Sequence, residues 1–214
     1  MKKLLFSLLL AFVSVFTVNA QSFELHQSYN DSKSAWGKSR LIAEYFWTSE
    51  NGKWNVFSWN SFSENGISGL LYGEYLLGKN FYIHPEVRMN RGNFKYEDIT
   101  PQIGIAYLIP WKNGADIYLT PKYSYNDICG SKHDLQFSVN SSYENDHVYY
   151  EGYLDTNWID AMNIFTEQKA YYKLTKNFQI GAAVVFNSTT FYKSEKGENS
   201  SLIQPYLSLR VALY

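Results

Sequence analysis

The chain has 214 residues, of which 45% are hydrophobic and only 18% are charged, and its formal net charge is −1. It contains 39 aromatic residues: six Trp, nineteen Tyr and fourteen Phe. This composition excludes intrinsic disorder, because disordered chains have few aromatic residues and a high net charge. It also excludes a bundle of membrane-spanning helices, since the sequence has a single long apolar run. The length fits one domain.

The apolar run covers residues 4–18, follows Lys2 and Lys3, and leads to a small residue at Ala20. This order is typical of a secretory signal peptide, with an N-terminal anchor helix as the alternative. We therefore predict a signal peptide over 1–20 and one domain over 21–214. That domain has 17 basic and 20 acidic side chains, a net charge of −3, so nothing electrostatic favours a nucleic-acid partner. Cys129 is the single cysteine, which excludes an internal disulfide.

Beyond the signal peptide, apolar residues recur at every second position, which is the period of a β-strand. In residues 81–90, for example, one face is apolar and the other carries His84, Glu86 and Arg88. Only 155–168 also allows a turn of helix. The alternation predicts about twelve strands, near 22–30, 39–49, 53–62, 66–77, 80–90, 100–109, 115–125, 132–142, 147–156, 163–173, 177–187 and 201–214.

The predicted strands are about ten residues long, which suits a tilted strand that crosses a bilayer better than a strand of a soluble protein. Every second connection is short, as in outer-membrane barrels, and the connections between them are mostly longer and more polar. We therefore predict an all-β protein, a transmembrane up-and-down antiparallel β-barrel of about twelve strands in the bacterial outer membrane. A soluble exported binding barrel, with the aromatic residues as its core, is the alternative.

Aromatic residues also lie near the ends of the predicted segments, where outer-membrane barrels carry belts at the two membrane interfaces. A contact with outer-membrane lipid is therefore expected. The residues in question are Trp47, Trp54, Tyr107, Trp111, Tyr123, Tyr125, Trp158, Phe178 and Tyr214.

The sequence carries no motif for catalysis. It has no Gly-x-Ser-x-Gly nucleophile elbow and no spacing typical of metal ligands. Four histidines, at positions 26, 84, 133 and 147, are the candidates for a general base, and for His84 a hydrogen bond within the wall is the simpler role. We predict no enzyme activity, no cofactor and no metal. An outer-membrane lipid-modifying hydrolase remains the alternative function.

A twelve-stranded barrel has a narrow interior, so charged side chains along its inner wall constrict the path. Taking the polar face of each segment as the lumen places interleaved charges of both signs and tyrosines inside. The facing of 53–62 stays open, because Trp54 opposes Phe57 and Trp59, and Tyr214 is in phase with the inner row of its segment. The inner residues are Glu24, His26, Arg40, Glu44, Phe46, Ser68, Tyr72, Glu74, Tyr82, His84, Glu86, Arg88, Asp116, Tyr118, Lys122, Asp134, Tyr149, Glu151, Tyr153, Asp155, Glu167, Lys169 and Arg210.

The segment Ser68-Gly69-Leu70-Leu71-Tyr72-Gly73-Glu74-Tyr75, followed by His84-Pro85-Glu86-Val87-Arg88, resembles the small outer-membrane barrels of Bacteroidetes. Some of these are similar to the nucleoside-specific channel-forming proteins of the Tsx type. The resemblance implies a monomeric twelve-stranded channel for small polar solutes, nucleosides above all. It implies lumen binding by Tyr72, Glu74, Glu86 and Arg88. The polar face adds Tyr82, Tyr118, Glu151 and Asp155 as further candidates for binding the solute.

Overall fold

The computed structural model describes residues 20–28, 38–64, 66–92, 99–111, 115–125, 133–158, 161–192 and 199–213. Residues 1–19 of the predicted signal peptide lie outside this part of the chain, as do Cys129 and Tyr214. The signal peptide and the facing of Tyr214 therefore stay predictions.

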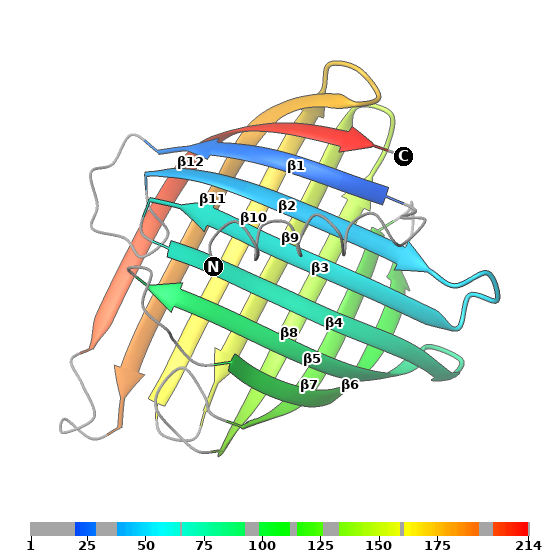
Figure 1. The fold of residues 1–214 in the computed structure, drawn as a ribbon, viewed down its shortest axis with the longest axis vertical. Helices are drawn as coiled ribbons and strands as arrows, with labels where there is room; N and C mark the ends of the chain where they lie inside the picture. Colours follow the sequence, from blue (N-terminus) through cyan, green and yellow to red (C-terminus); the bar gives the residue numbers. More distant parts are fainter. Residues whose placement is uncertain are drawn as a thin grey trace, which may run out of the picture.

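The described residues form a closed antiparallel β-barrel in which each strand pairs with its neighbours in the sequence (Figure 1). The prediction of a twelve-stranded up-and-down barrel is confirmed. The strands are β1 (Ala20–Gln27), β2 (Ser39–Thr48), β3 (Trp54–Ser63), β4 (Gly66–Gly78), β5 (Phe81–Gly92), β6 (Ile99–Trp111), β7 (Ala115–Tyr125), β8 (His133–Glu144), β9 (Val148–Asn157), β10 (Ala161–Lys173), β11 (Phe178–Phe191) and β12 (Ser200–Leu213).

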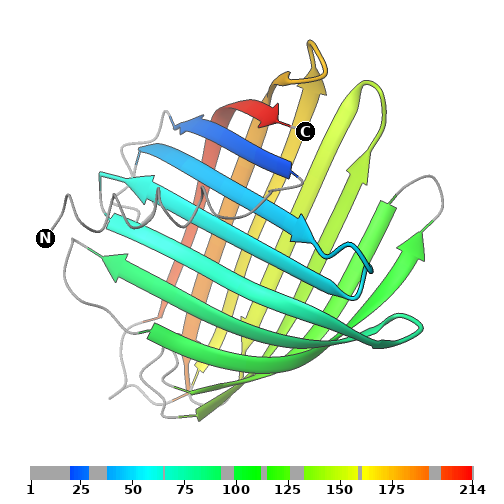
Figure 2. The same cartoon turned by 45° about the vertical axis from the view of Figure 1, so that its right-hand side comes forward.

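Strands β1 and β12 close the barrel through seven residue pairs, from Gln21 opposite Leu213 to Gln27 opposite Leu207. The start of β1 and the end of β12 therefore lie at one end of the barrel, which we call the turn end (Figures 1 and 2). The connections at this end, such as 79–80 and 145–147, are two to five residues long. At the other end, the loop end, they range from two residues, at 64–65, to eleven, at 28–38. Four of these six connections are longer than any at the turn end, so the alternation that the sequence predicts mostly holds.

The segment 155–168 contains no helix among its described residues. It consists instead of the end of β9 and the start of β10, so the alternative of a helical turn is wrong there. Tyr153 and Glu167 lie opposite each other in this hairpin. The described part of the chain has no helix that is long and apolar enough to cross a membrane.

The barrel has an apolar outside and a polar inside. In β12, for instance, Tyr206, Ser208 and Arg210 are buried, whereas Leu207 and Leu209 are exposed. The same division holds around the barrel: wherever the structure describes the side chain, the Asp, Glu, Lys and Arg residues of the strands all occupy the inward phase. Because water-soluble barrels place charge outside and apolar side chains inside, this polarity is inverted.

The outer surface carries large aromatic residues towards both ends of the barrel. Trp54 and Trp111 are exposed near the turn end, and Tyr125 and Trp158 near the loop end. Between them the exposed side chains are mostly Leu, Ile and Val, such as Leu207. This distribution matches the apolar band and the two aromatic girdles of membrane barrels.

Candidate functional site

The lumen contains a cluster of charged residues around Lys169 of β10. Its ammonium nitrogen lies 2.8 Å from Glu44 Oε1, 3.1 Å from Glu24 Oε2 and 3.2 Å from Glu151 Oε2. The Arg210 guanidinium adds a contact of 3.3 Å to Glu24 Oε1. A buried lysine is stable only when it is paired, and here three carboxylates compensate one ammonium.

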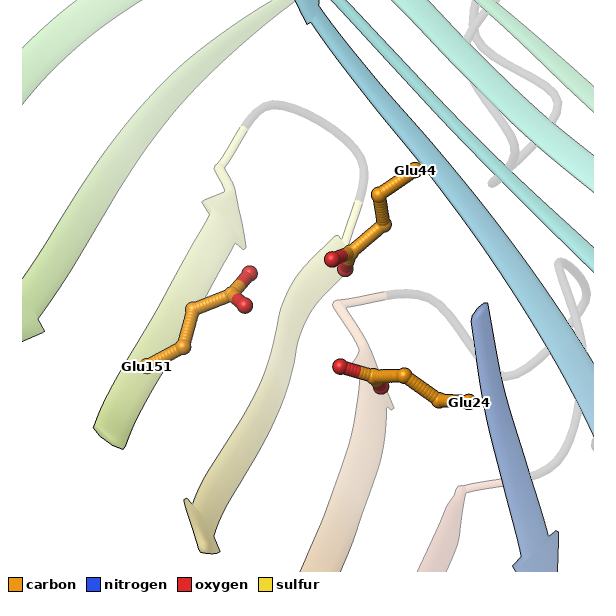
Figure 3. A group of neighbouring side chains, drawn as sticks. All are labelled: Glu24, Glu44 and Glu151. Atoms are coloured by element: carbon orange, nitrogen blue, oxygen red, sulfur yellow. The ribbon is translucent and has the colours of Figure 1, made fainter. Parts of the chain in front are cut away.

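These three glutamates converge from β1, β2 and β9 towards one point (Figure 3). One oxygen from each lies within 4.8 Å of the others, a spacing that could hold a metal ion. The Lys169 ammonium contacts all three carboxylates and supplies the positive charge that a metal would bring. We therefore assign no metal site here.

The Lys169 cluster extends towards the loop end through Arg40 and His26. Arg40 Nη2 forms an ion pair with Glu167 across the lumen, from β2 to β10, and lies 3.0 Å from His26 Nδ1. His26 Nε2 lies 3.0 Å from Glu24 Oε2 and 3.2 Å from the Tyr171 hydroxyl. His26 is thus enclosed within the wall and shielded from any solute in the lumen.

A second cluster lies around Arg88 of β5. Its guanidinium bonds to Glu86 on its own strand, and to Asp155 and the Tyr153 hydroxyl of β9, across the lumen. Lys122 Nζ of β7 lies 2.9 Å from Glu86 Oε2. The Arg88 cluster therefore ties β5 and β7 to β9.

His84 holds two carboxylates, Glu74 and Glu86, beside this second cluster. Its Nδ1 lies 3.1 Å from Glu74 Oε1 and its Nε2 3.0 Å from Glu86 Oε2. Both contacts are hydrogen bonds when both ring nitrogens carry protons, because a carboxylate only accepts. The Tyr72 ring covers the imidazole at a centroid distance of 4.6 Å. His84 thus has the wall hydrogen bonds that its position in the sequence predicts.

A cavity of about 600 Å³ lies between the two clusters. One side of it, formed by β2, β3 and β4, carries four rings, which we call the aromatic wall: Phe46, Phe57, Trp59 and Tyr72. The opposite side, formed by β7, β8 and β9, carries the polar wall: Asp116, Tyr118, Asn140, Ser142, Glu151 and Tyr153.

Strand register explains why each wall is continuous. Phe46, Phe57 and Tyr72 lie opposite one another in adjacent strands. On the polar wall, Asp116, Ser142 and Glu151 form an equivalent row, and Tyr118, Asn140 and Tyr153 form the next. Directly opposed residues of an antiparallel pair lie about 5 Å apart at Cβ, so each row presents its side chains side by side.

Five of the eight predicted binding residues line this cavity: Tyr72, Arg88, Tyr118, Glu151 and Asp155. The other three lie beside it. Glu74 and Glu86 are held by His84 in the wall, and Tyr82 packs against Tyr118 with ring centroids 6.3 Å apart.

Phe57 and Trp59 are cavity residues whose facing the sequence leaves open, because both phases of β3 contain aromatic residues. In the structure Trp54 is 45% exposed on the outside, whereas Phe57 and Trp59 face the lumen. The register with β2 supplies the missing signal, since Trp59 lies opposite Glu44, whose inward facing the sequence does predict.

No protein-family model matches the chain, and no curated protein matches it. Among solved structures it is similar to the KdgM porin, with a TM-score of 0.55, 10% identity, and coverage of 91% of this chain and 99% of that one. The KdgM porin in complex with disordered oligogalacturonate gives a TM-score of 0.56 at 11% identity, with the same coverage. The NanC porin gives a TM-score of 0.53 at 10% identity, again over 91% and 99% of the two chains. At this level of identity the similarity establishes the fold, a closed barrel like that of these porins.

Proposed function

We propose that this protein is an outer-membrane channel through which small polar solutes diffuse, without a cofactor. The observation that carries the proposal is the inverted polarity of the barrel: charged side chains point inward, and exposed Leu, Ile, Val and aromatic residues cover the outside. Such a surface is stable in a bilayer, and a charged lumen is stable when it contains water. The predicted signal peptide and the shared porin fold support the same location and role.

Nucleosides are the solutes that we favour. The cavity places the Phe57, Trp59 and Tyr72 rings opposite the carboxylate, amide and hydroxyl groups of the polar wall. A flat base can stack on aromatic rings while its ribose hydroxyls bond to polar side chains on the other side. Segments 68–75 and 84–88 resemble small outer-membrane barrels, some of which are similar to nucleoside-specific channels, and this resemblance favours the same class of solute.

The hydrolase alternative has less support. Ser-based acyl transfer requires a histidine within hydrogen-bonding reach of the serine hydroxyl. In the described strands the side chains of His26, His84 and His133 bond instead to Glu, Arg and Tyr residues. In a channel these histidines need no catalytic role, because their bonds to neighbouring side chains stabilise the wall of the barrel.

Liposome swelling tests the proposal. We expect vesicles that contain the purified protein to swell in isosmotic sugars, amino acids and nucleosides, and fastest in nucleosides relative to solutes of equal size. Trp59→Leu and Tyr72→Leu should slow nucleoside entry selectively, whereas Trp111→Leu, which removes an aromatic ring from the outside, should leave it unchanged. A protein that stays in the aqueous phase without detergent, or vesicles that do not swell, would contradict a membrane channel.

A further inference from the structure

The described lumen has an excess of negative charge. Its inward-facing carboxylates are Glu24, Glu44, Glu74, Glu86, Asp116, Asp134, Glu151, Asp155 and Glu167, nine in all, against five cations, Arg40, Arg88, Lys122, Lys169 and Arg210. The rim pair Lys173–Glu144 adds no net charge. The sum is −4 with His26 and His84 neutral, and −2 with both protonated. The lumen is therefore negative in either state, and low-dielectric walls strengthen its field.

Part of this excess is accessible from the cavity. Asp116 lines the cavity, and within the described residues its carboxylate has no ion pair and no hydrogen bond. The Glu151 side chain is 24% exposed, compared with 0% for Glu24 and 8% for Glu44, its partners around Lys169. The two accessible carboxylates flank Ser142 in one row of the polar wall, so they face the same part of the cavity.

The aromatic wall lies opposite these carboxylates, and aromatic faces attract cations. Rings elsewhere in the lumen already do so within the protein itself: the Arg210 guanidinium lies 4.0 Å from the centroid of Tyr149, and that of Arg40 lies 5.0 Å from Tyr206. Arg88, Lys169 and Arg210 also line the cavity, and each of them is already paired with carboxylates of the wall. A ligand between the two walls would therefore meet the carboxylates of the polar wall on one side and ring faces on the other. Both favour a positive charge and disfavour a negative one.

We infer that this cavity binds small organic cations, flat or methylated at the charged end, in preference to anions of the same shape. The inference rests on the proposed channel function and adds a charge preference to it: between a cation and an anion of the same shape, the cation is preferred. It separates this lumen from any site built for polyanions, because a carboxylate or sulfonate placed beside Asp116 and Glu151 would be repelled.

Calorimetric titration of the purified protein in detergent tests the inference with two probes of matched size, benzyltrimethylammonium and benzenesulfonate. We expect the ammonium to bind at least about tenfold more tightly, and 1 M salt to reduce this ratio by screening. Asp116→Asn should weaken ammonium binding at least about threefold, the effect of one unit charge about 6 Å away in water. Asp146→Asn, a matched change in the exposed turn between β8 and β9, should have no effect.

Equal binding of the two probes, tighter binding of the sulfonate, or no binding of either would overturn the inference. The wild-type comparison needs no variant, and Glu151→Gln repeats the test at the second carboxylate. Because binding is measured in detergent, its result is independent of transport. Ammonium binding without liposome swelling would reject the channel and leave the cation site, whereas swelling without charge preference would do the reverse.

Discussion

Lys169 is a central residue of the inner wall. It reaches from β10 towards β9, β1 and β2, and its ammonium contacts three carboxylates. Removing one partner of a buried charge pair costs about 3–5 kcal/mol, because the other partner is left uncompensated. Here the groups left behind would be three glutamates, each with one oxygen within 4.8 Å of the others. Of these, Glu24 would keep its contact with Arg210.

For Lys169→Met we therefore expect a loss of about 3–5 kcal/mol in unfolding free energy, measured by denaturant titration in detergent. We also expect Mn²⁺ or Ca²⁺ to restore part of it, since a divalent cation can replace the ammonium among three carboxylates. Lys173→Met removes a lysine at the rim, where its partner Glu144 is 43% exposed, and serves as the control with little change. Stability that does not respond to metal in Lys169→Met would contradict the role of Lys169 as the internal cation.

At the level of residues, the sequence predicts which side chains face inward but not which of them meet. Strand alternation places Arg88 and Asp155 on the inner face of their strands, and the twelve-strand closure brings β5 and β9 within reach of each other across the lumen. That pairing depends on register and tilt around the whole barrel, which local periodicity does not contain. For the same reason Asp116 is predicted only as a wall residue.

Among the elements, the contact between β10 and β11 requires a glycine. A Cβ atom on Gly181 would lie 2.0 Å from the Ala170 carbonyl oxygen and 2.8 Å from Tyr171 Cα. Because these are backbone atoms, they have little freedom to move aside. Gly181 thus leaves room for Tyr171, which packs within the inner wall and contacts His26.

We expect Gly181→Ala to lower the unfolding free energy by about 1–3 kcal/mol, the usual cost of overpacking. Gly78→Ala is the matched control, because a Cβ there would have no heavy atom within 4 Å. Urea titrations of both variants in the same detergent provide the comparison. Equal stability of the two would show that the strands adjust to the added methyl group.

The outward faces of the strands allow a test of the bilayer contact. Leu207 lies in the middle of β12 and is 52% exposed, whereas Leu213 ends the strand. We expect Leu207→Arg to cost about 2–4 kcal/mol in lipid vesicles and Leu213→Arg about 0–1 kcal/mol, since the penalty falls from the midplane to the interface. Equal losses of stability at the two positions would show that the apolar surface does not lie in a bilayer.

At the scale of the whole molecule, the proposed location in the outer membrane predicts an orientation from the lengths of the connections. Outer-membrane barrels place short turns in the periplasm and longer loops outside the cell. We expect a membrane-impermeant thiol reagent to label Tyr192→Cys, beyond β11 at the loop end, in intact cells. Asp146→Cys, in the turn after β8, should be labelled only in broken cells. Both variants need a Cys129→Ser background, and the reverse pattern would invert the assignment.

The fold could be predicted from the sequence because the strands and connections of a membrane barrel follow a regular pattern. Period-two alternation, strands of about ten residues and alternating connection lengths all recur around the chain, so twelve local patterns together define one closed sheet. The facing of β3 could not be predicted in this way, because the two alternating faces of this strand carry equal numbers of aromatic residues. The cavity could not be predicted, since its two walls are half a barrel apart and only closure places them opposite each other.

The seam between β1 and β12 determines where the barrel opens most easily. It is held by seven residue pairs, whereas β10 and β11 share thirteen. The ion pair between Arg210 of β12 and Glu24 of β1 spans the same seam on the inner side. Lateral opening, whether during insertion or under force, therefore has its lowest resistance here, and amide hydrogens of β1 should exchange with solvent before those of β10.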